Sequence, residues 1–225
     1  MTHISRKSAD DQIRAVAWDI DGTLVDSEPL HHACLAMISQ RYGVNLGPGS
    51  QERFLGRDMS WAWQALESGF PSELTFATWL NEIIDAYVEG ASTLVAQPFV
   101  LEAMQALQEA GIRQVCVSNS ERRIVDANLA ALGICDLLDF SISRDDIPVG
   151  KPHPIPYLEA CRRLNCAPGE VIAIEDSQSG LESARAAGLK TIFIASDEED
   201  LSVRHKAVGS ILGMCRAGNL VSTGV

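Results

Sequence analysis

Short apolar runs alternate with amphipathic stretches along most of this 225-residue chain. Five of the runs have the length of strands and few polar residues, as expected for strands buried on both faces of a parallel sheet. They are Ile13–Trp18, Arg113–Ser118, Leu138–Ser143, Val171–Glu175 and Lys190–Ala195. The stretches between them carry apolar residues at helical spacing, and several end on glycine, which is a helix stop signal. This alternation predicts an α/β fold with a doubly wound parallel sheet.

One region breaks the alternation. Only helical patterns occur between the first strand and Val95, interrupted by glycine- and proline-containing breaks. The sequence therefore predicts an α-helical cap domain, residues 28–95, inserted into an α/β core made of residues 1–27 and 96–225. The tail after Asp197 is too weakly patterned to be assigned a role.

Polar side chains follow the strands at one edge of the predicted sheet. In open parallel sheets, ligands bind outside the carboxyl ends of the strands. Four loops bring candidate residues to this edge: Asp19, Asp21, Ser118, Asn119, Lys151, Glu175 and Asp176. Asp19 and Asp21 are two residues apart, so in an extended strand end their side chains would point the same way. Because like charges that close repel, a cation is expected beside them.

This set of residues fits phosphoryl transfer through a covalent aspartyl phosphate. Carboxylates and water are the ligands that Mg²⁺ prefers, so Asp19 could serve as both nucleophile and metal ligand. Asp21 could protonate the leaving oxygen and later activate water. Ser118, Asn119 and Lys151, with backbone N–H groups, would bind the phosphate oxygens.

Several of these residues also have an ordinary structural explanation. Asp19 and Asp21 could form a turn followed by a helix cap. Ser118 and Asn119 could cap the helix that follows them, and Lys151 could be a solvated surface charge. The chemical interpretation depends on their occurrence together at one sheet edge.

Composition narrows the classes of partner. The formal net charge of −12 and the pI of about 4.8 argue against nucleic acid and anionic membranes, and no run approaches the roughly 20 apolar residues of a membrane span. The six cysteines include no C-x-x-C pair, which favours small buried hydrophobes in a reducing compartment. We expect a cytoplasmic monomer or small homo-oligomer whose partner is a small phosphorylated metabolite.

Four segments, "DIDGT", "VSNS", "GKPHP" and "EDSQSG", occur in this order within residues 13–195. They resemble the four motifs of haloacid dehalogenase superfamily hydrolases, in the branch that inserts a helical cap after the first motif and includes beta-phosphoglucomutase and sugar-phosphate phosphatases. The resemblance implies a Rossmann-like core, a Mg²⁺ cofactor and a cap that gates the site.

The resemblance also implies roles for single residues. Asp19 is the implied nucleophile, Asp21 the acid and base, and Ser118 and Lys151 the phosphate ligands. The implied metal site consists of Asp19, Asp176, the backbone carbonyl of Asp21 and, in support from close by, Glu175.

Two features select among the activities of this superfamily. Its dehalogenases lack an aspartate at the position of Asp21, which therefore favours phosphate esters. Its phosphonate-cleaving members use a cap lysine, and this cap contains none. We therefore predict a phosphoric monoester hydrolase, a Mg²⁺-dependent phosphatase acting on a small phosphorylated metabolite such as a sugar phosphate.

Two alternatives stay open. "DSEPLHH" places His31 where hexose-phosphate mutases of the beta-phosphoglucomutase type have a histidine beside the hinge, although those enzymes usually also have cap lysines. A non-catalytic protein that binds a phosphorylated metabolite is the other alternative. In the cap, "RFLGRDMSW" resembles a specificity loop, with Gly56 allowing Arg57 to turn inward. We predict that Arg57 and His31 contact the substrate.

Overall fold

The structure, a computed structural model, describes residues 12–54, 57–194, 209 and 213. Five strands form one parallel sheet in the order β3-β2-β1-β4-β5. They are β1 Ala15–Trp18, β2 Arg113–Val117, β3 Phe140–Ile142, β4 Val171–Glu175 and β5 Lys190–Phe193. Each lies within its predicted run, which confirms the predicted doubly wound sheet; Ala195 lies outside the described residues. The strand order reverses between β1 and β4, so a ligand crevice is expected at their carboxyl ends.

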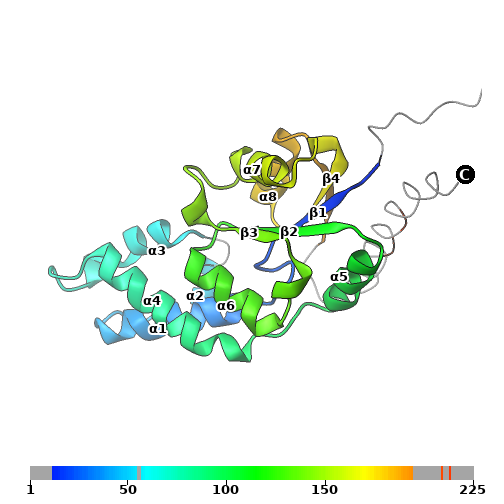
Figure 1. Ribbon diagram of the computed structural model, residues 1–225. Helices are drawn as coiled ribbons and strands as arrows, with labels where there is room; N and C mark the ends of the chain where they lie inside the picture. Colours follow the sequence, from blue (N-terminus) through cyan, green and yellow to red (C-terminus); the bar gives the residue numbers. More distant parts are fainter. Residues whose placement is uncertain (1–11, 55–56, 195–208, 210–212, 214–225) are drawn as a thin grey trace, which may run out of the picture.

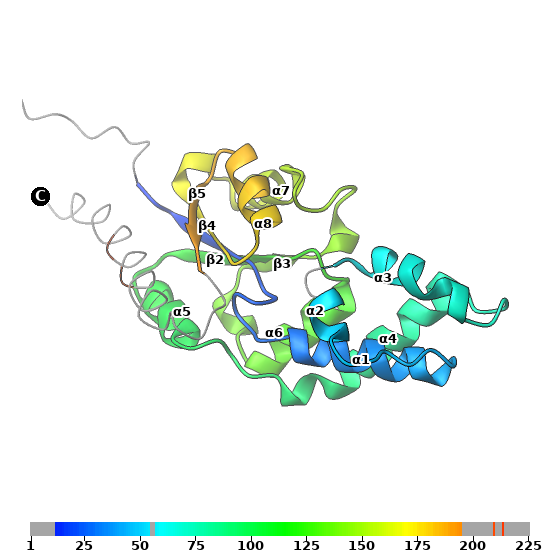
Figure 2. The same ribbon diagram turned by 180° about the vertical axis from the view of Figure 1, so that it is seen from behind.

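Helices cover both faces of the sheet, and a group of helices extends from one side of the core (Figures 1 and 2). The α-helices are α1 Glu28–Arg41, α2 Ser50–Phe54, α3 Met59–Leu66, α4 Phe76–Gly90, α5 Val100–Glu109, α6 Arg122–Leu132, α7 Ile155–Leu164 and α8 Gln178–Ala186. Short 3-10 helices are η2 Glu67–Gly69, η3 Ala91–Thr93, η4 Cys135–Leu137, η5 Arg144–Asp146 and η6 Pro168–Glu170.

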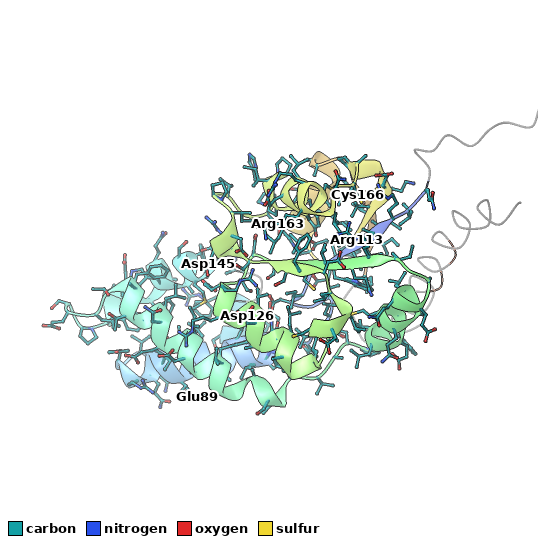
Figure 3. The ribbon with its side chains drawn as sticks, viewed as in Figure 1. Glu89, Arg113, Asp126, Asp145, Arg163 and Cys166 are labelled. Atoms are coloured by element: carbon teal, nitrogen blue, oxygen red, sulfur yellow. The ribbon has the colours of Figure 1, made fainter. Side chains whose placement is uncertain are left out.

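The alternating side chains of the strands build two cores, one on each face of the sheet. On one face, Trp18 of β1 packs in a buried cluster with Leu107 of α5 and with α6. On the other face, Ala17 of β1 packs in a cluster with Tyr157 of α7 and with α8. Side chains fill the space between the sheet and the helices on both faces (Figure 3). Because β1 is buried on both faces, the loop that follows it is held firmly at the centre of the sheet.

Polar bonds fix the amino end of β2, opposite the predicted site. The Arg113 side chain, labelled in Figure 3, donates to Asp139 Oδ2 at 2.6 Å and to the backbone oxygen of Leu164 at 2.5 Å. These bonds tie β2 to the start of β3 and to the end of α7.

The helical region between β1 and α5 has a core of its own. Residues of α1, α3 and α4 meet there, with Trp79 and Tyr87 fully buried. Ile124 of α6 joins this cluster, so the helical group packs directly against the α/β core. The cap is thus a helical layer as expected, while its exact boundaries, residues 28–95, stay a prediction.

Two further expectations concern membrane-spanning helices and the state of the cysteines. None of the helices within the described residues is long and apolar enough to cross a membrane. The five cysteines in the described part of the chain are free. Cys34, Cys116 and Cys161 are buried as expected and Cys166 is half-buried, whereas Cys135 is exposed because it lies in the short helix η4 at the surface.

We expect the core of α5 to contribute strongly to stability. Leu107 is fully buried, so Leu107→Ala should lower the free energy of unfolding by about 2–5 kcal/mol through lost burial and the remaining cavity. Leu158 on α7 is 42% exposed, and Leu158→Ala is the matched control, with an expected change below about 1 kcal/mol. Urea denaturation measures both, and equal losses would contradict the assignment of this core.

Candidate active site

Three predicted carboxylates meet at the carboxyl ends of β1 and β4. Asp19 follows β1, Glu175 ends β4 and Asp176 follows it, and each offers an oxygen within 4.8 Å of the others. Asp19 and Glu175 are buried, and Asp176 is half-buried. Gly22 allows this close approach: its φ is +81°, and a Cβ there would lie 1.9 Å from Asp176 Oδ2. A set of oxygen ligands of this kind fits Mg²⁺.

Repulsion and burial disfavour the charged forms of these acids. Burial raises the pKa of Asp19 well above its usual value, although Lys151 opposes the shift. Burial, followed by the charge of Glu175, raises the pKa of Asp176 to about 6. Thr23 donates a 3.3 Å hydrogen bond to Asp176 Oδ1. A divalent cation among these oxygens would favour their ionised forms.

Lys151 lies against the acidic cluster with a side chain that is only 3% exposed. Its Nζ donates to Asp19 Oδ1 at 2.6 Å, to Glu175 Oε1 at 2.5 Å and to the backbone oxygen of Val117 at 2.8 Å. Burial alone would lower the pKa of Lys151, but Asp19 and Glu175 hold it well above its usual value. The lysine is therefore a buried, charged partner of the proposed nucleophile and not a solvated surface charge.

Asn119 positions Lys151 through its backbone. Its side-chain Nδ2 donates to the Lys151 carbonyl at 3.0 Å, and its Oδ1 accepts from the Lys151 N–H at 2.8 Å. Gly150 makes room for this pair, since a Cβ there would lie 2.5 Å from Asn119 Oδ1. The Asn119 side chain is therefore occupied in holding the lysine, and the predicted contact of Asn119 with phosphate is left to its backbone N–H.

Asp21 faces a different set of partners from Asp19. Its Oδ1 accepts from Ser27 Oγ at 2.7 Å and from Asn128 Nδ2 at 3.1 Å. Its Oδ2 accepts from Ser120 Oγ at 2.8 Å and from Ser118 Oγ at 3.3 Å. Ser27 stands at the N-cap of α1 but makes no side-chain cap bond, because its hydroxyl is directed to Asp21. The N-cap of α6 is Glu121, so Ser118 is not a helix cap.

His31 joins these partners from the helical insert. Its Nε2 lies 3.5 Å from Asp21 Oδ1, and its ring stacks at 4.3 Å against Tyr87, whose hydroxyl donates to Asn128 Oδ1 at 2.8 Å. Burial alone would raise the pKa of Asp21, but hydrogen bonds from His31 and the serines bring it far below its usual value. Burial alone would lower the pKa of His31, but its bond to Asp21 raises it.

The structure bears less directly on two other predicted roles, those of Asp21 as a metal ligand and of Arg57 as a substrate contact. The Asp21 side chain is not part of the three-carboxylate group, so its metal contact through the backbone carbonyl stays a prediction. Arg57 is exposed, with its guanidinium carbon 4.9 Å from the centre of the Trp61 ring. Among the described residues, no hydrogen bond or ion pair joins Arg57 to the acidic cluster. Gly56, proposed to turn Arg57 inward, lies outside the described residues.

Several residues at the site were not predicted from the sequence. They are Thr23, Ser27, Tyr87, Ser120, Asn128 and Tyr157. Ser120 belongs to the "VSNS" segment and could have been found there. Tyr157, Tyr87 and Asn128 lie on the inner faces of helices, where the helical pattern marks only burial.

The fold and this edge define a class of protein: a Rossmann-like α/β core that gathers three carboxylates, two of which pair with one buried lysine. The model of the haloacid dehalogenase-like hydrolases matches residues 13–188, and the chain belongs to this family. A phosphoglycolate phosphatase of Thiobacillus denitrificans is 31% identical over 183 residues, which cover 78% of this chain and 80% of the relative. A phosphorylated carbohydrates phosphatase of Thermotoga maritima is 26% identical over 182 residues, covering 80% and 84%.

The same fold occurs in solved structures. A protein from Thermotoga maritima that carries the provisional name of a beta-phosphoglucomutase has a TM-score of 0.73 and 23% identity, over 91% of this chain and 99% of that one. The prediction of an enzyme of the haloacid dehalogenase class is confirmed, and the two relatives described above are phosphatases.

We expect position 180 to require glycine, because the Glu175 side chain lies where a larger residue would place its Cβ. A Cβ on Gly180 would lie 1.9 Å from Glu175 Oε2, whereas a Cβ on Gly169 would have no neighbour within 4 Å. Gly180→Ala should lower the free energy of unfolding by about 1–3 kcal/mol through overpacking, although alanine is the better helix former. Gly169→Ala is the control. Thermal and urea unfolding measure both, and a stabilised Gly180→Ala variant would contradict this packing of Glu175.

Proposed function

We propose that the chain hydrolyses the phosphate ester of a small metabolite, such as a sugar phosphate, with Mg²⁺ and a covalent intermediate on Asp19. The observation that carries the proposal is the 2.6 Å contact between Lys151 Nζ and Asp19 Oδ1 within the three-carboxylate group. A nucleophile beside a buried ammonium and a cation site can approach an anionic phosphate without prohibitive repulsion.

The proposed metal ligands are Asp19, Asp176 and the Asp21 carbonyl, with Glu175 in support. Bound there, Mg²⁺ would neutralise charge on the phosphate oxygens. An Asp19 oxygen attacks phosphorus, and the bond from phosphorus to the ester oxygen breaks. The leaving oxygen takes a proton from Asp21. Water then attacks the aspartyl phosphate and gives its proton to Asp21, which releases phosphate and restores Asp19.

The position of Asp21 adds a requirement to this mechanism. With four hydroxyl and amide donors and His31 around it, Asp21 is an ionised acceptor. An ionised carboxylate has no proton to give, so Asp21 must take one up as its partners change before it can protonate the leaving oxygen. Two of those partners meet where the helical insert begins: His31 lies on α1 of the insert, and Ser27 is the N-cap residue directly before α1. Movement of this insert on substrate binding would therefore supply the change.

The proposed substrate class has support from the relatives and from the cap. The relatives are named for phosphoglycolate and for phosphorylated carbohydrates, which are small and anionic. In the cap, Arg57 and His31 are the proposed cationic contacts for such substrates, and the cap sequence contains no lysine.

The first test is phosphate release from a panel of metabolite phosphates, with Mg²⁺ and then with a chelator. We expect release from a few sugar or short-chain acid phosphates that the chelator abolishes. Asp19→Asn should lower kcat by roughly 10³-fold or more, as for loss of a nucleophile. Asp126→Asn, which changes an aspartate in an exposed pair on α6, is the control.

Other outcomes would favour the alternatives. Interconversion of hexose 1- and 6-phosphates with little free phosphate would indicate a mutase, to which the position of His31 beside Asp21 would be suited. Binding of phosphorylated metabolites without turnover would indicate a binding protein. Full activity in Asp19→Asn would remove Asp19 as the nucleophile.

Arg57 is proposed to contact the leaving group. We expect Arg57→Ala to raise KM for the preferred metabolite about tenfold, as for loss of one charge-assisted hydrogen bond, and to change KM for an aryl phosphate much less. Arg53, which lies 5.3 Å from the Phe54 ring, offers a matched arginine–aromatic pair as control. Equal changes for both substrates would place Arg57 outside the specificity site.

A further inference from the structure

All the hydrogen-bond donors of Lys151 are in use. An ammonium group has three protons, and Nζ has three acceptors: Asp19 Oδ1, Glu175 Oε1 and the Val117 carbonyl. The Lys151 side chain is only 3% exposed, so its acceptors come from the surrounding protein. For Lys151 to bind a phosphate oxygen, as the proposed function requires, it must release one of these acceptors.

Of the three acceptors, Glu175 is the one that Lys151 can release, because Glu175 has other hydrogen-bond donors. The Tyr157 hydroxyl donates to Oε1, the same oxygen that accepts from Lys151. Ser177 Oγ lies 3.3 Å from the other carboxylate oxygen. Among the described residues, neither Asp19 nor the Val117 carbonyl has a second side-chain donor. A Glu175 released by the lysine would therefore keep the hydrogen bond from Tyr157.

Tyr157 is also placed to stay where it is while Lys151 moves. It is fully buried on the inner face of α7, within the core between α7, α8 and the sheet. Its ring centre lies 5.3 Å from Lys151 Nζ, within the range of a cation–π contact. The residue thus touches both members of the pair that must separate, with its hydroxyl on one and its ring beside the other.

We propose that Tyr157 is a positioning residue that holds Glu175 when Lys151 transfers one hydrogen bond from Glu175 to the substrate phosphate. This inference rests on the proposed function, since it assumes phosphate at this site. Its physical basis is the cost of a buried carboxylate that loses its donor. Without the hydroxyl, Glu175 Oε1 would have Lys151 as its one side-chain donor among the described residues, and Glu175 would compete with phosphate for the lysine.

The test is Tyr157→Phe, which removes the hydroxyl and keeps the ring. At saturating Mg²⁺, we expect the affinity for inorganic phosphate to fall about tenfold, or about 1.4 kcal/mol, and KM for the best ester to rise to a similar extent. The value of kcat should change less than about threefold, because the groups that react are untouched. A general loss of structure would not produce this separation of KM from kcat.

Tyr42→Phe is the matched control, because Tyr42 also donates to a glutamate, Glu82 Oε1 at 2.5 Å, in the helical insert. It should leave phosphate affinity unchanged. In a Glu175→Gln background the effect of Tyr157→Phe should fall below about twofold, since no buried charge then depends on the hydroxyl. An undiminished effect in that background, or unchanged phosphate affinity in Tyr157→Phe alone, would overturn the inference.

A second experiment uses the unaltered protein, so that its result does not depend on whether the variants fold. It is the determination of a structure with Mg²⁺ and inorganic phosphate bound. We expect Lys151 Nζ on a phosphate oxygen, no longer on Glu175, and Tyr157 still bonded to Glu175. A Lys151 that keeps Glu175, or a protein that binds no phosphate, would overturn the inference. Failure of the proposed function alone would give a different result. Phosphate would bind and replace Glu175 as an acceptor of Lys151, yet no ester would be hydrolysed.

Discussion

The site depends on one buried ammonium among three carboxylates. Lys151 contacts Asp19 and Glu175 directly, while Asp176 lies in the same group of oxygens. Burying charges is costly unless they are paired and hydrogen-bonded. A single lysine can balance only one of these three acids if all are ionised, and this imbalance supports the Mg²⁺ site proposed above. The convergence of β1, β4 and the loop before α7 thus creates the environment shared by the lysine and the acids.

Asp19 and Asp21 show how two carboxylates that are close in sequence can acquire opposite chemistry. Burial raises the pKa of Asp19, with a single lysine to oppose it, whereas donors from both the core and the helical insert lower the pKa of Asp21. The turn between them directs one side chain to the sheet centre and the other toward α1 and α6. This difference separates a group suited to the proposed metal and phosphate from one whose hydrogen-bond partners include a residue of the helical insert, His31.

Most of the architecture and the centre of the site could be predicted from the sequence, because both follow from local patterns. Strands buried on both faces must be apolar throughout, and their carboxyl ends must meet at one edge. Asp19, Lys151, Glu175 and Asp176 could therefore be brought together without coordinates. What local patterns could not show is how each side chain is used. The contact of Asn119 with phosphate stays a prediction, and what the sequence did not show is that its side-chain amide holds the backbone of Lys151.

The site residues that were not predicted from the sequence were missed for one physical reason. Tyr157 and Asn128 lie on helix faces that turn inward, where a helical pattern indicates burial and nothing more. Their polar atoms meet acids from distant parts of the chain, Glu175 and Asp21. A buried polar group must find a partner, so each such residue implies a partner without identifying it. The partner is decided by the packing of α6 and α7 on the sheet, and that packing is what makes a tyrosine in an apolar core part of the site.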